Sequence, residues 1–228
     1  MRVRAVLAGL TAAVVLTGCG ELEAELGRQA DKDGGSSSSS SKVDVKEARG
    51  KLEKLDVKGR APKTGFDRDE FGPAWADVDR NGCDTRNDIL KRDLTDETFK
   101  AGTHDCIVLT GVLEDPYGGE TIKFERGQDT SSDVQIDHLI PLSDAWQKGA
   151  QQWSAAKRKE FANDPLNLLA VDGPLNSQKS DSDAATWLPP RRGYRCAYIA
   201  RQIDVKAKYE LWVTRAEKDA MERVLDSC

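Results

Sequence analysis

The stretch Val134-Gln135-Ile136-Asp137-His138-Leu139-Ile140-Pro141-Leu142 places an aspartate and a histidine side by side in an otherwise apolar run. Its apolar and β-branched residues predict an extended segment over residues 134–140, which Pro141 helps to end. Neighbouring side chains of an extended segment point to opposite faces, so Asp137 and His138 would project on opposite sides. An imidazole beside a carboxylate in such a run is a candidate for acid–base or metal chemistry.

Two segments downstream could complete such a site. The first, Asn163-Asp164-Pro165-Leu166-Asn167-Leu168-Leu169-Ala170-Val171, predicts a short apolar strand over residues 167–171. The second, Asn176-Ser177-Gln178-Lys179-Ser180-Asp181, leads into a segment over 177–187 that predicts a helix, which stops before Pro189-Pro190. A strand pair followed by a helix is therefore expected around the Asp-His pair.

These residue types suit hydrolysis of a phosphodiester, which needs an activated water and charge stabilisation at the phosphate. Mg²⁺ takes oxygen ligands and keeps several waters, so Asp137 and Asn176 would be enough protein ligands. The bound ion would polarise the phosphoryl oxygens. His138, whose reference pKa is close to neutral, could act as the base.

Helix and strand patterns are intermixed along the rest of the chain without regular alternation, which predicts an α+β fold. Turn residues at 115–119 separate two β-rich runs, and this pattern predicts a β-hairpin N-terminal to the candidate site. Ser143 and Ser154 are candidate helix N-caps. The hairpin strands are expected at 107–113 and 121–124, and the helices at 87–92, 143–149, 154–162, 195–212 and 216–225.

The order Asp-His-apolar-apolar-Pro, then Asn-Leu, then Asn-x-x-Lys resembles the motif of HNH endonucleases. The chain is more closely similar to the GmrSD-type subgroup of that family and its exported members, over about residues 64–228. This resemblance implies a ββα-metal core with an N-terminal β-hairpin region and C-terminal helices. The segments that carry the closer similarity are 66–72, 79–86, 113–117, 137–138, 163–167 and 187–189.

The resemblance also implies roles for single residues. Asp137 matches the first metal ligand and Asn176 the second, while His138 matches the base that activates water. Asn167 matches the middle asparagine of the motif, which usually braces the loop that carries the base. Lys179 matches a cation that related domains place near the substrate phosphate.

Three further features refine this expectation. Many HNH enzymes begin the motif with two histidines, and the aspartate of this chain favours Mg²⁺ or Mn²⁺ over softer metals. Arg68 and Arg86 have acidic neighbours, so each could form a structural ion pair or bind the phosphate backbone. The tryptophans are expected to pack in the core or at its rim, although a base-stacking role stays open.

The N-terminus predicts export. Residues 1–18 combine a basic start with a short apolar stretch, and Leu-Thr-Gly-Cys resembles a lipobox that would lipidate Cys19; an ordinary secretory signal is the alternative. Residues 19–61, which contain a serine run and no aromatic residue, predict a lipid-anchored flexible linker. The nuclease domain is then expected at 62–228, on the outer face of the cell membrane or secreted.

The remaining four cysteines suit an oxidising compartment. Proximity in the sequence favours the disulfides Cys83–Cys106 and Cys196–Cys228. A four-cysteine zinc site is the alternative, although the chain has no Cys-x-x-Cys pair.

The predicted activity is that of a DNA endonuclease, although the formal net charge of −5 is unusual for a nucleic-acid binder. A local basic surface would suffice, because a bound metal adds positive charge. A ribonuclease or dual nuclease is one alternative, since nothing in the sequence reads the 2′-hydroxyl. A noncatalytic envelope binding protein is another. The expected partners are nucleic acid, DNA before RNA, and the membrane through the anchor, with no obligate protein partner.

Overall fold

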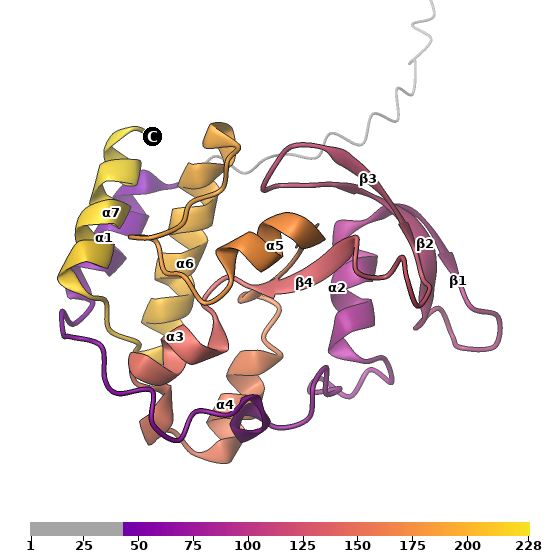
Figure 1. The fold of residues 1–228 in the computed structure, drawn as a ribbon, viewed down its shortest axis with the longest axis horizontal. Coiled ribbons are helices and arrows are strands. Elements are labelled where there is room, and N and C mark those ends of the chain that lie inside the picture. Colours follow the sequence, from indigo (N-terminus) through magenta and orange to yellow (C-terminus); the bar gives the residue numbers. More distant parts are fainter. Residues whose placement is uncertain (1–42) are drawn as a thin grey trace, which may run out of the picture. The chain divides into compact units, whose positions relative to one another are not determined.

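The computed structural model describes residues 43–228, which Figure 1 draws in colour. The predicted signal peptide, Cys19 and most of the predicted linker lie outside the described residues. Within them, helices are mixed with small antiparallel sheets, which confirms the α+β class. The elements are α1 (Val45–Lys54), η1 (Arg68–Phe71), α2 (Thr85–Asp93), β1 (Thr95–Phe99), β2 (Val108–Glu114), β3 (Thr121–Glu125), β4 (Val134–His138), α3 (Leu142–Gln147), η2 (Ala150–Gln152), α4 (Ala155–Ala162), β5 (Leu168–Asp172), α5 (Gly173–Lys179), η3 (Arg192–Tyr194), α6 (Arg195–Tyr209) and α7 (Arg215–Asp226).

Helix α1 belongs to the folded body, so the structured domain begins earlier than the predicted boundary at residue 62. The Asp44 side chain caps the helix by accepting a hydrogen bond from the Glu47 amide. Ala48 and Leu52 are buried in the cluster that α6 and α7 also contribute to. A helix of this length is marginal alone, and packing on two partner helices stabilises it. The low average hydrophobicity of this segment gave no indication in the sequence that the helix packs on other helices.

The predicted hairpin, formed by β2 and β3, is part of a three-stranded antiparallel sheet in the order β1-β2-β3. Strands β2 and β3 pair in the predicted place, with Gly111 opposite Phe124. Strand β1 was not predicted, because its sequence Thr-Asp-Glu-Thr-Phe is mostly polar and exposed. Helix α2 contacts both this sheet and the second one, as Figure 1 shows.

Strands β4 and β5 form the second sheet, and α5 follows β5 directly. The pairing is antiparallel and places Asp137 opposite Leu169 and His138 opposite Leu168. Residues 139–167 between the strands contain α3, η2 and α4. Two antiparallel strands and a helix thus surround the Asp-His pair, as expected.

The prediction of a helix over residues 177–187 was wrong. Helix α5 begins at Gly173, where Asp172 caps it and proline fits the first turn. It ends at Lys179, because Ser180 has a φ of 52° that a right-handed helix does not allow.

Of the two serines predicted as helix N-caps, only one caps a helix in the structure. Ser154 caps α4 by accepting a hydrogen bond from the Lys157 amide, as predicted. Ser143 does not cap α3, which begins one residue earlier after Pro141. Its hydroxyl instead donates to the Asp181 carboxylate at 2.8 Å.

Both predicted disulfides are present. Cys83–Cys106 joins the segment before α2 to the loop between β1 and β2. Cys196–Cys228 joins the start of α6 to the C-terminal residue after α7. No helix in residues 43–228 has the length and apolar character needed to cross a membrane.

Residues 56–75, here called the strap, link α1 to the region before α2 and pass along α3 and α4 (Figure 1). Backbone hydrogen bonds fasten the strap at Lys58, whose amide donates to Val213, and at Ala61, whose amide donates to Gln147. Arg60 lies between these points and turns inward to a set of buried charges.

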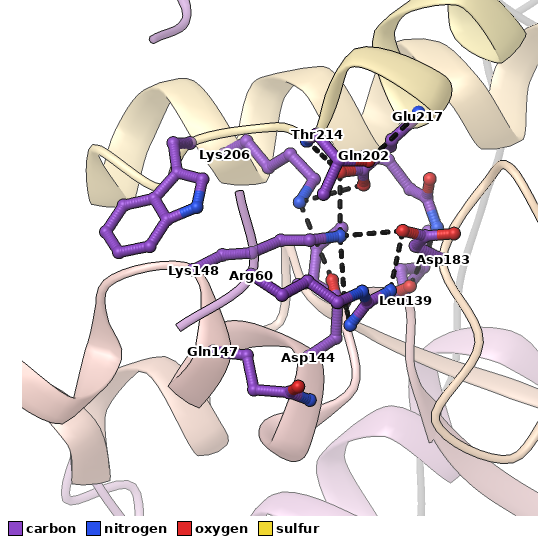
Figure 2. Close-up of polar contacts among 12 residues, drawn as sticks. Arg60, Leu139, Asp144, Gln147, Lys148, Asp183, Gln202, Lys206, Thr214 and Glu217 are labelled. Atoms are coloured by element: carbon purple, nitrogen blue, oxygen red, sulfur yellow. Dashed lines mark hydrogen bonds and ion pairs between the residues drawn. The ribbon is translucent and has the colours of Figure 1, made fainter. Parts of the chain in front are cut away.

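Arg60, itself partly exposed, and the five buried charges make up three cations and three carboxylates, here called the buried ion cluster and shown in Figure 2. Lys148 is fully buried and contacts Asp144, Asp183 and Glu217 at 2.7, 2.9 and 2.7 Å. The remaining members of the buried ion cluster are Arg60 and Lys206. Because the charges balance and each is paired, burial is tolerated. The cluster ties the strap to α3, α6 and α7.

Candidate active site

A cavity of about 510 Å³ lies where the strap, β4 and α5 meet. Five residues predicted for the site line it: Arg68, Arg86, Asp137, His138 and Asn176. They come from η1, α2, β4 and α5, so the fold brings together side chains that are far apart in the sequence. Two other predicted residues, Asn167 and Lys179, do not line the cavity.

The His138 ring is oriented by a single backbone contact. Its Nε2 atom lies 2.8 Å from the carbonyl oxygen of Ala162. A carbonyl only accepts hydrogen bonds, so Nε2 carries the proton and Nδ1 of a neutral ring has a lone pair. Burial, reinforced by the positive charges of Arg68 and Lys179, lowers the pKa of His138 to about 4. The ring is therefore neutral at physiological pH and can accept a proton.

Asn176 presents an amide oxygen to the cavity wall. It lies in α5 and is half-buried, and its Nδ2 donates to Oε1 of Gln135 on β4 at 2.9 Å. This bond fixes the orientation of the amide. Within residues 43–228 its Oδ1 has no hydrogen-bond partner, so it is available as a hard oxygen ligand.

Asp137 is buried and already engaged by two donors. Nζ of Lys179 donates to Oδ1 at 2.9 Å, and the Tyr117 hydroxyl donates to Oδ2. Burial raises the pKa of Asp137, and both of these contacts oppose the rise. Each carboxylate oxygen keeps a second lone pair, so Asp137 can still bind a cation at the cavity wall.

The position of Lys179 corrects the prediction that it contacts the substrate phosphate. The side chain is fully buried, and its ammonium also donates to the carbonyl oxygen of His138 at 2.9 Å. It therefore acts on β4 from inside the protein. The Asn-x-x-Lys spacing places Lys179 one helical turn after Asn176. Its side chain, however, points to Asp137 and not to solvent.

Asn167 is buried beside the segment that follows β4. Its Oδ1 accepts from the Ile140 amide at 2.9 Å, and its Nδ2 donates to the Ile140 carbonyl oxygen at 3.2 Å. The amide and the carbonyl group of Ile140, close to the Asp-His pair, are thus both hydrogen-bonded to the Asn167 side chain. This geometry is that of a brace for the loop.

The two arginines differ in their surroundings. Arg86 donates to the carbonyl oxygens of Ser131 and Val134 at 3.2 and 3.3 Å, and it makes no ion pair with any of residues 43–228. Arg68 is exposed at the cavity rim on the strap. Both guanidinium groups keep N–H donors for an anion entering the cavity.

Trp75, for which packing was expected and a base-stacking role was left open, lines the cavity beside the histidine. Its ring is stacked on that of His138, with the ring centroids 6.1 Å apart and the planes 17° from parallel. The sequence offered no periodicity that would place it there, because it lies on the irregular strap. Lys63, also on the strap, lines the cavity too and pairs with Asp181 at 3.0 Å.

The donor set fits a hard divalent cation. Among residues 43–228, no three His, Cys, Asp or Glu side chains gather into a metal-binding group. The oxygen donors that line the cavity include the carboxylate of Asp137 and the amide oxygen of Asn176. The Asp181 carboxylate also lines the cavity, but it is bound to Lys63 and Ser143. Mg²⁺ commonly uses one or two protein oxygens and fills its other positions with water and phosphate oxygens.

Sites in which an imidazole base shares a cavity with oxygen donors and cations are typical of phosphodiester hydrolases. Comparison with known families agrees with this class. The chain belongs to the family of GmrSD restriction endonucleases, C-terminal domain, whose model matches residues 84–224. The match spans α2 to α7 and includes the whole Asp-His region, while the strap precedes it. The resemblance inferred from the sequence is thereby confirmed.

A relative from Arthroderma benhamiae (strain ATCC MYA-4681 / CBS 112371) is 38% identical over 183 residues. The alignment covers 79% of this chain and 84% of the relative, which is described as an uncharacterized secreted protein. No solved structure matches the chain.

Proposed function

We propose that this protein is an exported, metal-dependent endonuclease that hydrolyses phosphodiester bonds of DNA. The observation that carries the proposal is the orientation of His138, whose protonated Nε2 is bound to the Ala162 carbonyl. Its Nδ1 has no hydrogen-bond partner within residues 43–228, and the cavity is also lined by Asp137, Asn176 and two arginines. Family membership supports a nuclease activity.

In the reaction, Nδ1 of His138 takes a proton from the attacking water, and the Ala162 carbonyl keeps the ring in the tautomer that can do so. Arg68 and Arg86 hold the phosphate through their free N–H groups. Asn176 and Asp137 would hold Mg²⁺ or Mn²⁺. When bound, the cation supplies positive charge to the phosphoryl and leaving oxygens.

We assign β4, β5 and α5 to the ββα-metal core of the HNH family. The base lies on the first strand, the brace Asn167 directly precedes the second, and the amide ligand lies on the helix. This order of roles supports the assignment. Export is proposed from the N-terminal sequence and from the relative described as secreted, and lipidation at Cys19 from the Leu-Thr-Gly-Cys order.

The decisive experiment measures plasmid cleavage by the full chain with Mg²⁺, with and without EDTA. His138→Ala is expected to lose several orders of magnitude in rate, because general-base catalysis contributes about 10²–10⁴-fold. His104→Ala is the matched control, since this histidine lies in an exposed loop outside the cavity. The proposal fails if the wild type does not cleave in a metal-dependent way, or if His138→Ala keeps full activity.

A titration with Mg²⁺ tests the ligand assignment separately. Asn176→Ala is expected to need a higher Mg²⁺ concentration for half-maximal rate, because it removes a protein ligand. If the wild type and Asn176→Ala needed the same Mg²⁺ concentration for half-maximal rate, Asn176 would not be a metal ligand. Single-stranded RNA assayed in parallel distinguishes a DNA endonuclease from a ribonuclease or dual nuclease.

A further inference from the structure

A second cavity, of about 200 Å³, adjoins the first and is also lined by residues of the strap. The two cavities share Arg68, Trp75, His138 and Leu142 as lining residues. The remaining walls of the second cavity are largely apolar, with Phe71, Pro73, Ala74 and Ala162 among them. A small, mostly apolar space therefore opens next to the histidine proposed as the base.

The volume limits the occupant. At ~30 Å³ per molecule of liquid water, 200 Å³ corresponds to about seven waters. This is enough for one flat heteroaromatic ring system and too little for a base pair. Trp75 supplies an aromatic wall, and such walls bind nucleobases by stacking without strong sequence preference.

One polar group of this cavity lacks a partner. Asn163 is 1% exposed and lines the cavity, and its Nδ2 donates to the Lys159 carbonyl oxygen at 2.9 Å. Its Oδ1 has no hydrogen-bond partner within the described part of the chain, and this atom is itself buried, so it lies just behind the cavity wall. A buried acceptor left unpaired costs about 1–3 kcal/mol, which a ligand with an N–H edge could recover. A nucleobase has such an edge, and an aliphatic side chain does not.

The backbone at Trp75 is held in an unfavourable conformation. Its φ is 56°, in the left-handed region that large side chains rarely adopt. Hydrogen bonds from Thr85 to the carbonyl oxygens of Trp75 and Ala76 keep it there, at 3.3 and 2.6 Å. The start of α2 thus fixes the ring at the boundary between the two cavities, in a position defined before any ligand binds.

We propose that the second cavity binds one unpaired nucleobase of the strand whose phosphate lies at His138. The base stacks on Trp75, and its backbone passes Arg68 into the first cavity. A small turn of the Asn163 side chain brings Oδ1 to the cavity surface, where it accepts an N–H from the base. This inference rests on the proposed nuclease function and adds a substrate preference. Because a paired base does not fit, single-stranded or locally opened DNA is cut faster than a closed duplex.

Binding without catalysis gives the first test. The full chain is titrated in EDTA with a labelled abasic oligonucleotide that carries a single adenine, and with the fully abasic strand. The wild type is expected to bind the single-adenine strand about tenfold more tightly, since stacking contributes about 1–3 kcal/mol per base and 1.4 kcal/mol is tenfold. Equal affinities would overturn the proposal.

Ala74→Leu fills the cavity from an exposed position, so it should not disturb folding. It is expected to remove the preference for the adenine while binding of the fully abasic strand is unchanged. Ala101→Leu makes the same change in an exposed loop that lines neither cavity, and it should keep the preference. A full preference in Ala74→Leu would show that the base binds elsewhere.

The role of Asn163 has its own test. A thymine at the single base position is compared with difluorotoluene, which has the same shape but no N–H. The wild type should prefer thymine by about fivefold, the equivalent of one hydrogen bond of about 1 kcal/mol, and Asn163→Leu should not discriminate. Discrimination that survives in Asn163→Leu would contradict this contact.

Cleavage in Mg²⁺ separates this inference from the proposed function. Cutting is expected at the phosphates next to the single base. If nothing is cut, the nuclease proposal fails, and the EDTA titration still decides on the base site. If the abasic strand is cut as fast as the strand with the base, the base site is wrong and the nuclease proposal stands.

Discussion

The ammonium of Lys179 donates a 2.9 Å hydrogen bond to Oδ1 of Asp137, and both side chains are buried. A carboxylate that is adjacent to the proposed base is therefore neutralised from within the protein. The same ammonium binds the His138 carbonyl, so α5 and β4 are joined at the residue that carries the chemistry. Lys179 thus acts as a positioning residue.

Lys179→Met should lower the free energy of unfolding by about 3–5 kcal/mol, because removing one partner leaves a buried carboxylate without its counter-charge. Urea unfolding at neutral pH measures this. Adding Asp137→Asn should recover much of the stability but not the activity. Lys123→Met, on the exposed strand β3, is the matched control and should change stability little. A stable Lys179→Met protein with weaker phosphate binding would restore the original prediction of a substrate contact.

The core of the site could be predicted from the sequence because its signal is local. The residues Asp137 and His138 lie on a short strand whose pattern was clear. Antiparallel pairing of β4 with β5 then brings Asn176, on the helix that follows β5, to the same cavity. The hairpin of β2 and β3 was predictable for the same reason. Both disulfides followed from proximity along the chain.

Features that depend on tertiary packing were not predictable. Helix α1 has few apolar residues, and its stability comes from α6 and α7, which lie far away in the sequence. The burial of Lys179 depends on which face of α5 meets β4. Trp75 reaches the cavity from an irregular strap, which has no periodicity to read.

Asn167→Ala should destabilise the fold by about 2–4 kcal/mol, because the amide and the carbonyl of Ile140 would both lose their partner in a buried position. It should also lower kcat more than it raises KM, since the loop beside His138 loses its fixed conformation. Urea unfolding and steady-state kinetics measure the two effects. Asn167→Asp keeps the acceptor for the Ile140 amide but turns a carboxylate oxygen toward the Ile140 carbonyl. An equal effect of both variants on kcat, with unchanged stability, would contradict the bracing role.

Acid should weaken the fold through Asp164. Burial alone raises the pKa of this carboxyl, but hydrogen bonds from Lys208, the Leu166 amide and Tyr209 hold it below the usual value. A carboxylate with a lower pKa in the folded state stabilises the protein above its unfolded pKa of about 3.9. This stability is lost as the pH falls below about 4 and passes through the folded pKa.

The measurement is urea unfolding from pH 7 to the acid range, with Asp164→Asn beside the wild type. The difference in the free energy of unfolding between the two should be constant near neutrality and shrink below about pH 4. Asp129→Asn, a change of the same kind at an exposed position, should follow the wild type throughout. A difference that does not depend on pH would mean that Asp164 acts by packing alone.

Lys148→Met tests the buried ion cluster. The change leaves Asp144, Asp183 and Glu217 with only Arg60 and Lys206 as counter-charges, and a loss of about 3–5 kcal/mol is expected. Thermal and urea unfolding measure it. Lys58→Met removes a lysine from the exposed pair with Asp56 and should cost no more than about 1 kcal/mol. If Lys148→Met and Lys58→Met lowered the free energy of unfolding equally, the buried ion cluster would contribute no more to stability than an exposed ion pair.

The disulfide Cys196–Cys228 should stabilise the C-terminal helices through the unfolded state. It closes a loop with a sequence separation of 32 residues and fixes the chain end after α7 to the start of α6. Replacing both cysteines by serine should lower the free energy of unfolding by about 3–4 kcal/mol. Because the cavity is formed by other elements, kcat at a temperature where the variant is folded should match the wild type. The contribution is measured by urea unfolding of the variant and of the wild type, without reductant. If kcat falls while the fold persists, the α6–α7 pair acts on the site through the buried ion cluster and the strap.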